Sequence, residues 1–166
     1  MTGKIFIENY EGKNNAPERY QEWNRLGLYR NLATVLVCPT RGTCFTRVAF
    51  SWMNLMGGFN APLAKMCIEG YEVGEAYNQA LIQILSNPQL AKFQYLLTLE
   101  EDNTVSPDSL IKLYQSIEKF DVVSALYWLK GPDGCPQIWG DPKEPFTYVP
   151  QPVGTERLQE CNGTGM

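Results

Sequence analysis

Four apolar runs of strand character, separated by segments with helical spacing, mark the middle of the chain. They cover residues 33–38, part of 61–68, 95–99 and 121–127. Pro39 and Gly42 follow the first run, and continuous apolar runs bounded by such residues are typical of strands buried on both faces. The pattern therefore predicts the buried strands of a parallel sheet.

Between these runs, apolar residues recur at the spacing of helices. One stripe extends from Val48 to Met56, a second covers 73–85, and a third begins with Ser106 as N-cap and Pro107 in the first turn. Strands and helices thus alternate from the first run to the last. This order predicts an α/β fold with a mostly parallel, Rossmann-like sheet and helices on both faces.

The two ends of the chain lack this alternation. Residues 1–31 are polar and mixed, and we expect an N-terminal extension with a short helix at 18–28. Residues beyond 130 are rich in proline, glycine and aromatic residues, which predicts an irregular segment with one or two short strands. We expect one main domain over residues 32–166.

Composition excludes several classes of function. The chain has 166 residues, a net charge of −4 and no basic patch, so nucleic acid is not an expected partner. No apolar stretch approaches the roughly 20 residues that span a bilayer. The chain has no histidine, which excludes a histidine-based triad or imidazole base. Five cysteines without a C-x-x-C pair or a signal-peptide pattern predict free thiols and a cytoplasmic location.

Polar residues follow the first and third predicted strands. Thr40 and Arg41 come after the first strand, and Glu100, Glu101 and Asp102 come after the third. Because ligands bind beyond the carboxyl ends of parallel strands, we expect these two segments to meet at one edge of the sheet. The alternative is that the acids merely end a strand in solvent.

Three adjacent carboxylates point to a cation as partner. Strand alternation predicts that Glu100 and Asp102 share a face and that Glu101 points to the other. Two carboxylates suit Mn²⁺ or Mg²⁺, which fill their remaining positions with water and phosphate oxygens. Arg41 adds a possible bidentate contact to phosphate.

The same segments resemble the GT-A-fold glycosyltransferases, the family-2-like kind found in bacteria and phages. Residues 39–42 are similar to the opening of that fold, and residues 97–103 resemble its D-x-D element, with Glu100 and Asp102 as the two acids. Residues 105–110, 121–127 and 160–166 are similar to the following helix, the next strand and a glycine-containing segment near the acceptor. The resemblance covers residues 33–166.

The resemblance implies a metal-dependent transfer of a sugar from a nucleoside-diphosphate sugar to a carbohydrate or other hydroxyl acceptor. Asp102 would coordinate Mn²⁺ or Mg²⁺, and Glu100 would face the ribose or the metal. The remaining residues implied to line the nucleotide, sugar or acceptor are Pro39, Thr40, Arg41, Gly163, Thr164 and Gly165.

The chain also departs from this family. Glu100 replaces the usual first aspartate, and Tyr77 stands where an arginine is usual. The family's catalytic base would follow Met166, so we expect a domain that is incomplete at its C-terminal end and assign no catalytic residue. Two alternatives stay open: a non-catalytic nucleotide- or carbohydrate-binding remnant, and a nucleotidyltransferase, whose glycine-rich signature residues 39–43 supply only in part.

Overall fold

A computed structural model describes residues 21, 32–57, 62–117, 120–129, 134–154 and 159–164. The chain divides into two compact units, Met1–Glu118 and Lys119–Met166, which are described separately below. The predicted helix at 18–28 lies outside the described residues except for Gln21. The first unit contains the elements β1 (Thr34–Thr40), α2 (Thr46–Met53), β2 (Leu63–Glu69), α3 (Val73–Ser86), η1 (Leu90–Lys92), β3 (Tyr95–Thr98) and α4 (Ser109–Ser116).

The three strands of the first unit form a parallel sheet in the order β2-β1-β3. Thr34 is in register with Leu63 on one side and with Tyr95 on the other. β1 lies in the centre, and its residues 34–38 are all buried, which confirms the predicted strand buried on both faces. The strand continues through Pro39 to Thr40, two residues beyond the predicted end.

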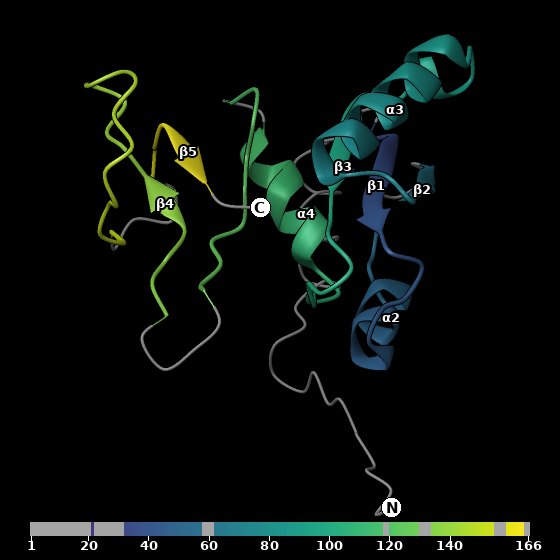
Figure 1. Ribbon diagram of the computed structural model, residues 1–166, viewed down its shortest axis with the longest axis horizontal. Coiled ribbons are helices and arrows are strands. Elements are labelled where there is room, and N and C mark those ends of the chain that lie inside the picture. Colours follow the sequence, from purple (N-terminus) through teal and green to yellow (C-terminus); the bar gives the residue numbers. More distant parts are fainter. Residues whose placement is uncertain are drawn as a thin grey trace, which may run out of the picture. The chain divides into compact units, whose positions relative to one another are not determined.

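Helix α3 covers one face of this sheet (Figure 1). Val35 and Val37 of β1 pack there against Ala80, because alternate residues of a strand point to the same face. The N-cap of the helix is Glu72, whose side chain accepts a hydrogen bond of 2.9 Å from the Gly74 N–H. The apolar stripe predicts that Ala76, Ala80, Leu81, Ile84 and Leu85 point inward. Ala76 and Ala80 are fully buried and Ile84 is half-buried, whereas the prediction is wrong for Leu81 and Leu85, which are 44% and 75% exposed.

Helices α2 and α4 pack against the other face. Leu36 and Cys38 of β1 contact Trp52 of α2 there, and Leu110 and Ile111 of α4 form a second cluster on the same side. Helices on both faces of a parallel sheet confirm the predicted α/β class. The arrangement is compatible with a Rossmann-like fold.

Helix α4 begins later than its sequence predicts. Ser106 is not the N-cap, because its hydroxyl donates to the Asp108 carboxylate at 2.7 Å and its carbonyl accepts from the Ser109 N–H at 3.0 Å. Pro107 and Asp108 therefore form a turn ahead of the helix. Asp108 is fully buried and forms an ion pair of 2.9 Å with Lys112. Burial alone would raise the pKa of Asp108, but hydrogen bonds from Lys112 and Ser106 lower it below its usual value.

The predicted fourth strand at 121–127 is wrong. These residues contain no strand in the structure, and Val122 is 84% exposed. The connection from β1 to β2 passes over the α4 face, where Leu55 and Met56 pack, and the connection from β2 to β3 passes over the α3 face. These two connections cross the sheet in opposite directions and over opposite faces, so both crossovers have the same hand. A further parallel strand placed beside β3 and connected through α4 would require a crossover of the opposite hand. Crossovers of that hand are rare.

The described residues of the second unit contain one short antiparallel pair. Its strands are β4 (Ile138–Trp139) and β5 (Gly163–Thr164), joined in the register Ile138↔Thr164. Isolated bridges add Trp128↔Pro136 and Trp139↔Pro150. These two short strands within an irregular segment are what the proline and glycine content predicts.

Candidate site at the carboxyl edge of the sheet

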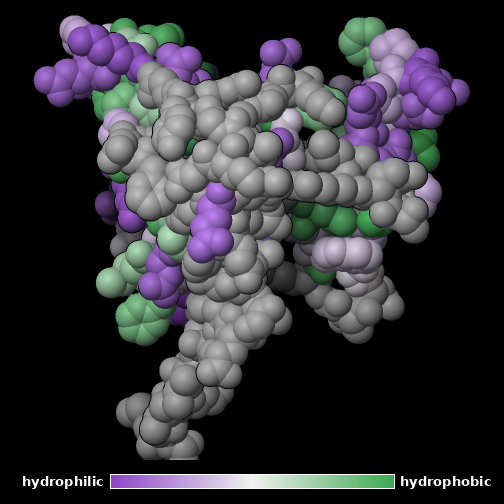
Figure 2. All heavy atoms as spheres, turned by 180° about the vertical axis from the view of Figure 1, so that it is seen from behind, coloured by the Kyte–Doolittle hydropathy of each residue, from purple (hydrophilic) through white to green (hydrophobic). Residues whose placement is uncertain are grey.

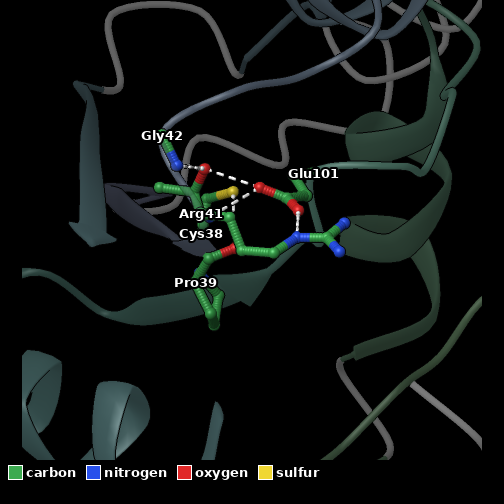
Figure 3. Close-up of polar contacts among 6 residues, drawn as sticks. Cys38, Pro39, Arg41, Gly42 and Glu101 are labelled. Carbon is green, nitrogen blue, oxygen red and sulfur yellow. Dashed lines mark hydrogen bonds and ion pairs between the residues drawn. The ribbon is translucent and has the colours of Figure 1, made fainter. Parts of the chain in front are cut away.

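The segments that follow β1 and β3 are joined by a single carboxylate. Glu101 accepts a hydrogen bond of 2.7 Å from the Thr40 hydroxyl and one of 2.8 Å from the Arg41 backbone N–H. Its second oxygen lies 2.5 Å from Nε of Arg41 (Figure 3). These residues are 61 and 60 positions apart in the chain. The structure therefore brings together the two segments that the sequence predicts to meet.

The carboxylate that makes this connection is not one of the two predicted from strand alternation. Glu101 was expected to point away from the partner loop, yet it faces Thr40 and Arg41. The cause is that β3 ends at Thr98, and a turn closed by the Asn103 N–H and the Glu100 carbonyl at 3.1 Å follows. The two-residue period of a strand no longer applies in that turn.

These contacts hold Glu101 in its ionised form. The hydrogen bond from Thr40, then those from the backbone and side chain of Arg41, lower the pKa of Glu101 from 4.5 to about 2. The Glu101 side chain is only 12% exposed, whereas the Arg41 side chain is 88% exposed. Figure 3 shows the two terminal nitrogens of the guanidinium directed away from Glu101. Glu101 thus fixes the position of Arg41, while the end of the Arg41 side chain lies in solvent.

The loop after β1 also requires a glycine. Gly42 has φ +87°, and its N–H donates to the Thr40 hydroxyl at 3.0 Å. The same hydroxyl donates to Glu101, so it links Gly42 to that carboxylate. A Cβ at Gly42 would lie 2.4 Å from Oε1 of Glu69. The end of β2 therefore places a further carboxylate beside this loop.

Helix α2 supports the loop after β3 from another side. Nε1 of Trp52 donates to the Asn103 carbonyl at 2.9 Å, and the Val105 N–H donates to the buried Ser51 hydroxyl at 3.3 Å. The apolar stripe from Val48 to Met56 predicts that Trp52 lies in the core rather than at a ligand. A signal was present, because a buried tryptophan N–H needs an acceptor.

Glu100 and Asp102 flank Glu101 and are both half-buried. Over the described ranges, histidine, cysteine and carboxylate side chains do not gather in groups of three that could hold a metal ion. A divalent cation held by Glu100 and Asp102 alone would need further oxygens from a bound ligand. That is the donor set that Mg²⁺ and Mn²⁺ accept together with phosphate.

Tyr77 of α3 lies near Glu100. Its hydroxyl oxygen is buried and, within the described part of the chain, has no hydrogen-bond partner. Burial first, and then the charge of Glu100 and the nearby Cys38, raise the pKa of Tyr77. The position where the resembling family has an arginine thus holds a neutral hydroxyl.

The cysteines are free thiols, as predicted. Burial first, and then the neighbouring thiol of Cys67, raise the pKa of Cys38 to about 12. Cys38 is therefore protonated and unreactive at neutral pH, since the thiolate is the nucleophile. Its side chain packs against α2 from its place in β1.

The remaining predicted residues are placed as follows. Pro39 is half-buried within β1, and Gly163 and Thr164 form β5 of the second unit. Gly165 lies outside the described residues. The prediction that residues of both units line one ligand site stays a prediction.

Comparisons with protein-family models, curated proteins and solved structures find no match for this chain. The glycosyltransferase resemblance therefore rests on the motifs alone. In the part of the chain that the structure describes, no helix is long and apolar enough to cross a membrane.

Proposed function

We propose that this chain binds a nucleoside-diphosphate sugar together with Mn²⁺ or Mg²⁺ and serves in a glycosyltransferase. The observation that supports this most is the contact between Arg41 and Glu101, because it joins the carboxyl ends of β1 and β3. Ligands of parallel α/β sheets bind at such an edge. The exposed guanidinium of Arg41 is a suitable partner for phosphate oxygens.

The charge of this edge requires a cation for a diphosphate to bind. Glu100 and Asp102 flank Glu101 in the chain, Glu101 is bonded to Arg41, and the Glu69 carboxylate lies beside Gly42. Four carboxylates would repel a diphosphate, and a divalent ion between them removes that repulsion. When bound, the ion would also stabilise the charge on the departing diphosphate.

The three acids at the end of β3 have different roles in this proposal. Glu101 has a pKa of about 2 and is bonded to Arg41 and Thr40, so it is a poor base at neutral pH and acts as a positioning residue. Asp102 and Glu100 remain the proposed metal ligands. The general base of the transfer is not assigned to a residue of this chain.

Tyr77 favours a second candidate, a protein that binds the nucleotide sugar without transferring it. The hydroxyl of Tyr77 brings no positive charge to a position where the resembling family has an arginine. This candidate predicts the same binding with no release of nucleoside diphosphate. A turnover assay with several nucleotide sugars and hydroxyl acceptors separates the two.

Isothermal titration calorimetry with UDP and GDP, with and without Mn²⁺, tests the binding itself. We expect binding only with Mn²⁺, loss of binding in Asp102→Ala, and a loss of about tenfold, or about 1.4 kcal/mol, in Arg41→Ala. Asp121→Ala, which removes an exposed carboxylate from the other unit, is the matched control and should bind like the wild type. Equal affinity with and without metal, or an unaffected Asp102→Ala variant, would contradict the proposal.

A further inference from the structure

Asn162 holds the 140–151 loop of the second unit through its side-chain amide. Its Nδ2 lies 3.0 Å from each of the carbonyl oxygens of Asp141, Glu144 and Thr147, and 3.4 Å from the Thr147 hydroxyl. All of these carbonyl groups are acceptors, so the position requires a donor. The backbone N–H of Asn162 adds a hydrogen bond of 2.9 Å to the Trp139 carbonyl.

The loop around this amide is tightly closed. A Cβ on Gly140, which has φ +74°, would lie 2.0 Å from the Thr147 carbonyl oxygen and 2.7 Å from Nδ2 of Asn162. Phe146 is held at φ 68° while 89% exposed, a conformation that costs a bulky residue free energy. The hydrogen bonds of Asn162 help to offset this cost.

The residue after Asn162 is Gly163, and this Asn–Gly pair occurs once in the sequence. In such a pair the backbone nitrogen of the glycine can attack Cγ of the asparagine, because no side chain obstructs its approach. The nitrogen loses its proton to solvent, the side-chain nitrogen leaves as ammonia, and a succinimide ring forms. Water then opens the ring at either carbonyl and gives aspartate or isoaspartate.

The folded loop opposes this reaction. Nδ2 is held by the loop carbonyls, and Gly163 is part of β5, where it pairs with Trp139. The attack requires the Asn162 side chain to turn toward the Gly163 nitrogen, and hence the loop to open. The reaction rate therefore reports how often the loop opens.

We propose that Asn162–Gly163 is a site of spontaneous deamidation that irreversibly releases the 140–151 loop. The product replaces a donor by a carboxylate directed at three carbonyl oxygens, and Asp141 and Glu144 add further negative charge nearby. Like partial charges at this distance repel one another. The loop then cannot close as before, since no side-chain group at position 162 donates to it.

Mass spectrometry of the purified full chain, with peptide mapping for aspartate and isoaspartate at 162, tests the reaction. We expect slower conversion in the folded wild type than in urea, faster conversion in folded Gly140→Ala than in the wild type, and none in Asn162→Gln. Gly163→Ala should slow conversion in urea as well. Equal rates for the folded and the urea-unfolded chain, or no conversion in Gly140→Ala while the unfolded chain converts, would overturn the proposal.

Hydrogen exchange of Asn162→Asp tests the structural consequence without relying on the reaction. The Gly140 N–H, bonded to Val149, and the Gln151 N–H, bonded to Ile138, report on loop closure. We expect both to lose protection in Asn162→Asp, and to lose less in Asn162→Ala, which removes the donor without adding charge. Wild-type protection of both amides in Asn162→Asp would overturn the claim that deamidation releases the loop.

Discussion

At the residue scale, Glu101 connects two segments that are far apart in the sequence. Its pKa is lowered to about 2 from 4.5 by Thr40 and Arg41, so it favours folding in its ionised form. This contribution is fully present above pH 4.5 and is lost as the pH falls toward about 2, where the carboxylate takes up a proton.

The pH dependence of Glu101→Gln tests this contribution. The wild type should be more stable than the variant at neutral pH, and the two free energies of unfolding should converge as the pH falls from 4.5 to about 2. Denaturant unfolding at a series of pH values measures this difference, with Asp121→Asn as the control. A difference that stays constant over that range would contradict the account.

At this scale the sequence predicted which segments meet but not which atoms join them. Alternation selected Glu100 and Asp102, and it failed because β3 stops at Thr98 and a turn reverses the direction of Glu101. The contacts of Asn162 were beyond prediction for a related reason. Its acceptors lie 15 to 21 residues away and are brought together by tertiary structure alone.

At the element scale, burial on both faces explains why β1 was predicted well. The largely apolar run from Ala33 to Cys38 is typical of a strand covered on each side, and the helical stripes supplied that cover. Segment 121–127 has similar apolar character and yet forms no strand. Composition predicts strand character locally, but a parallel strand also needs a connection of the favoured hand to join a sheet.

Helix surfaces of the first unit differ sharply in burial. Ile111 of α4 is fully buried, whereas Ile82 of α3 is 55% exposed, together with Leu81 and Leu85 on the same helix. Figure 2 shows hydrophobic side chains in green among hydrophilic ones in purple on the surface of the described residues. Exposed apolar side chains are common on globular proteins, and here three of them lie close together along one helix.

A matched pair of substitutions measures this difference. Ile111→Ala should lower the free energy of unfolding by about 2–5 kcal/mol, because it leaves a cavity between α4 and the sheet. Ile82→Ala makes the same chemical change in a helix and should stay within about 0.5 kcal/mol of the wild type. Denaturant unfolding of both variants gives the two values. Similar losses for both would mean that α4 does not pack as described.

At the scale of the whole molecule, the chain comprises two compact units with different construction. The first is an α/β sheet whose carboxyl edge carries Arg41 and the acids, and the second is an irregular unit built around β4, β5 and Asn162. The periodicity of the sequence predicted the α/β class of the first unit. The sequence predicted the second unit only as a change of composition, since long-range contacts rather than a repeating pattern define that unit.

The central claim is that the edge between β1 and β3 holds a divalent cation and a diphosphate. A crystal structure with Mn²⁺ and UDP or GDP, using the anomalous signal of manganese, tests it most directly. We predict one manganese beside Asp102 and Glu100, with the diphosphate between the ion and Arg41, and Glu101 still bonded to Arg41. A manganese peak elsewhere, or a nucleotide bound away from this edge, would contradict the account.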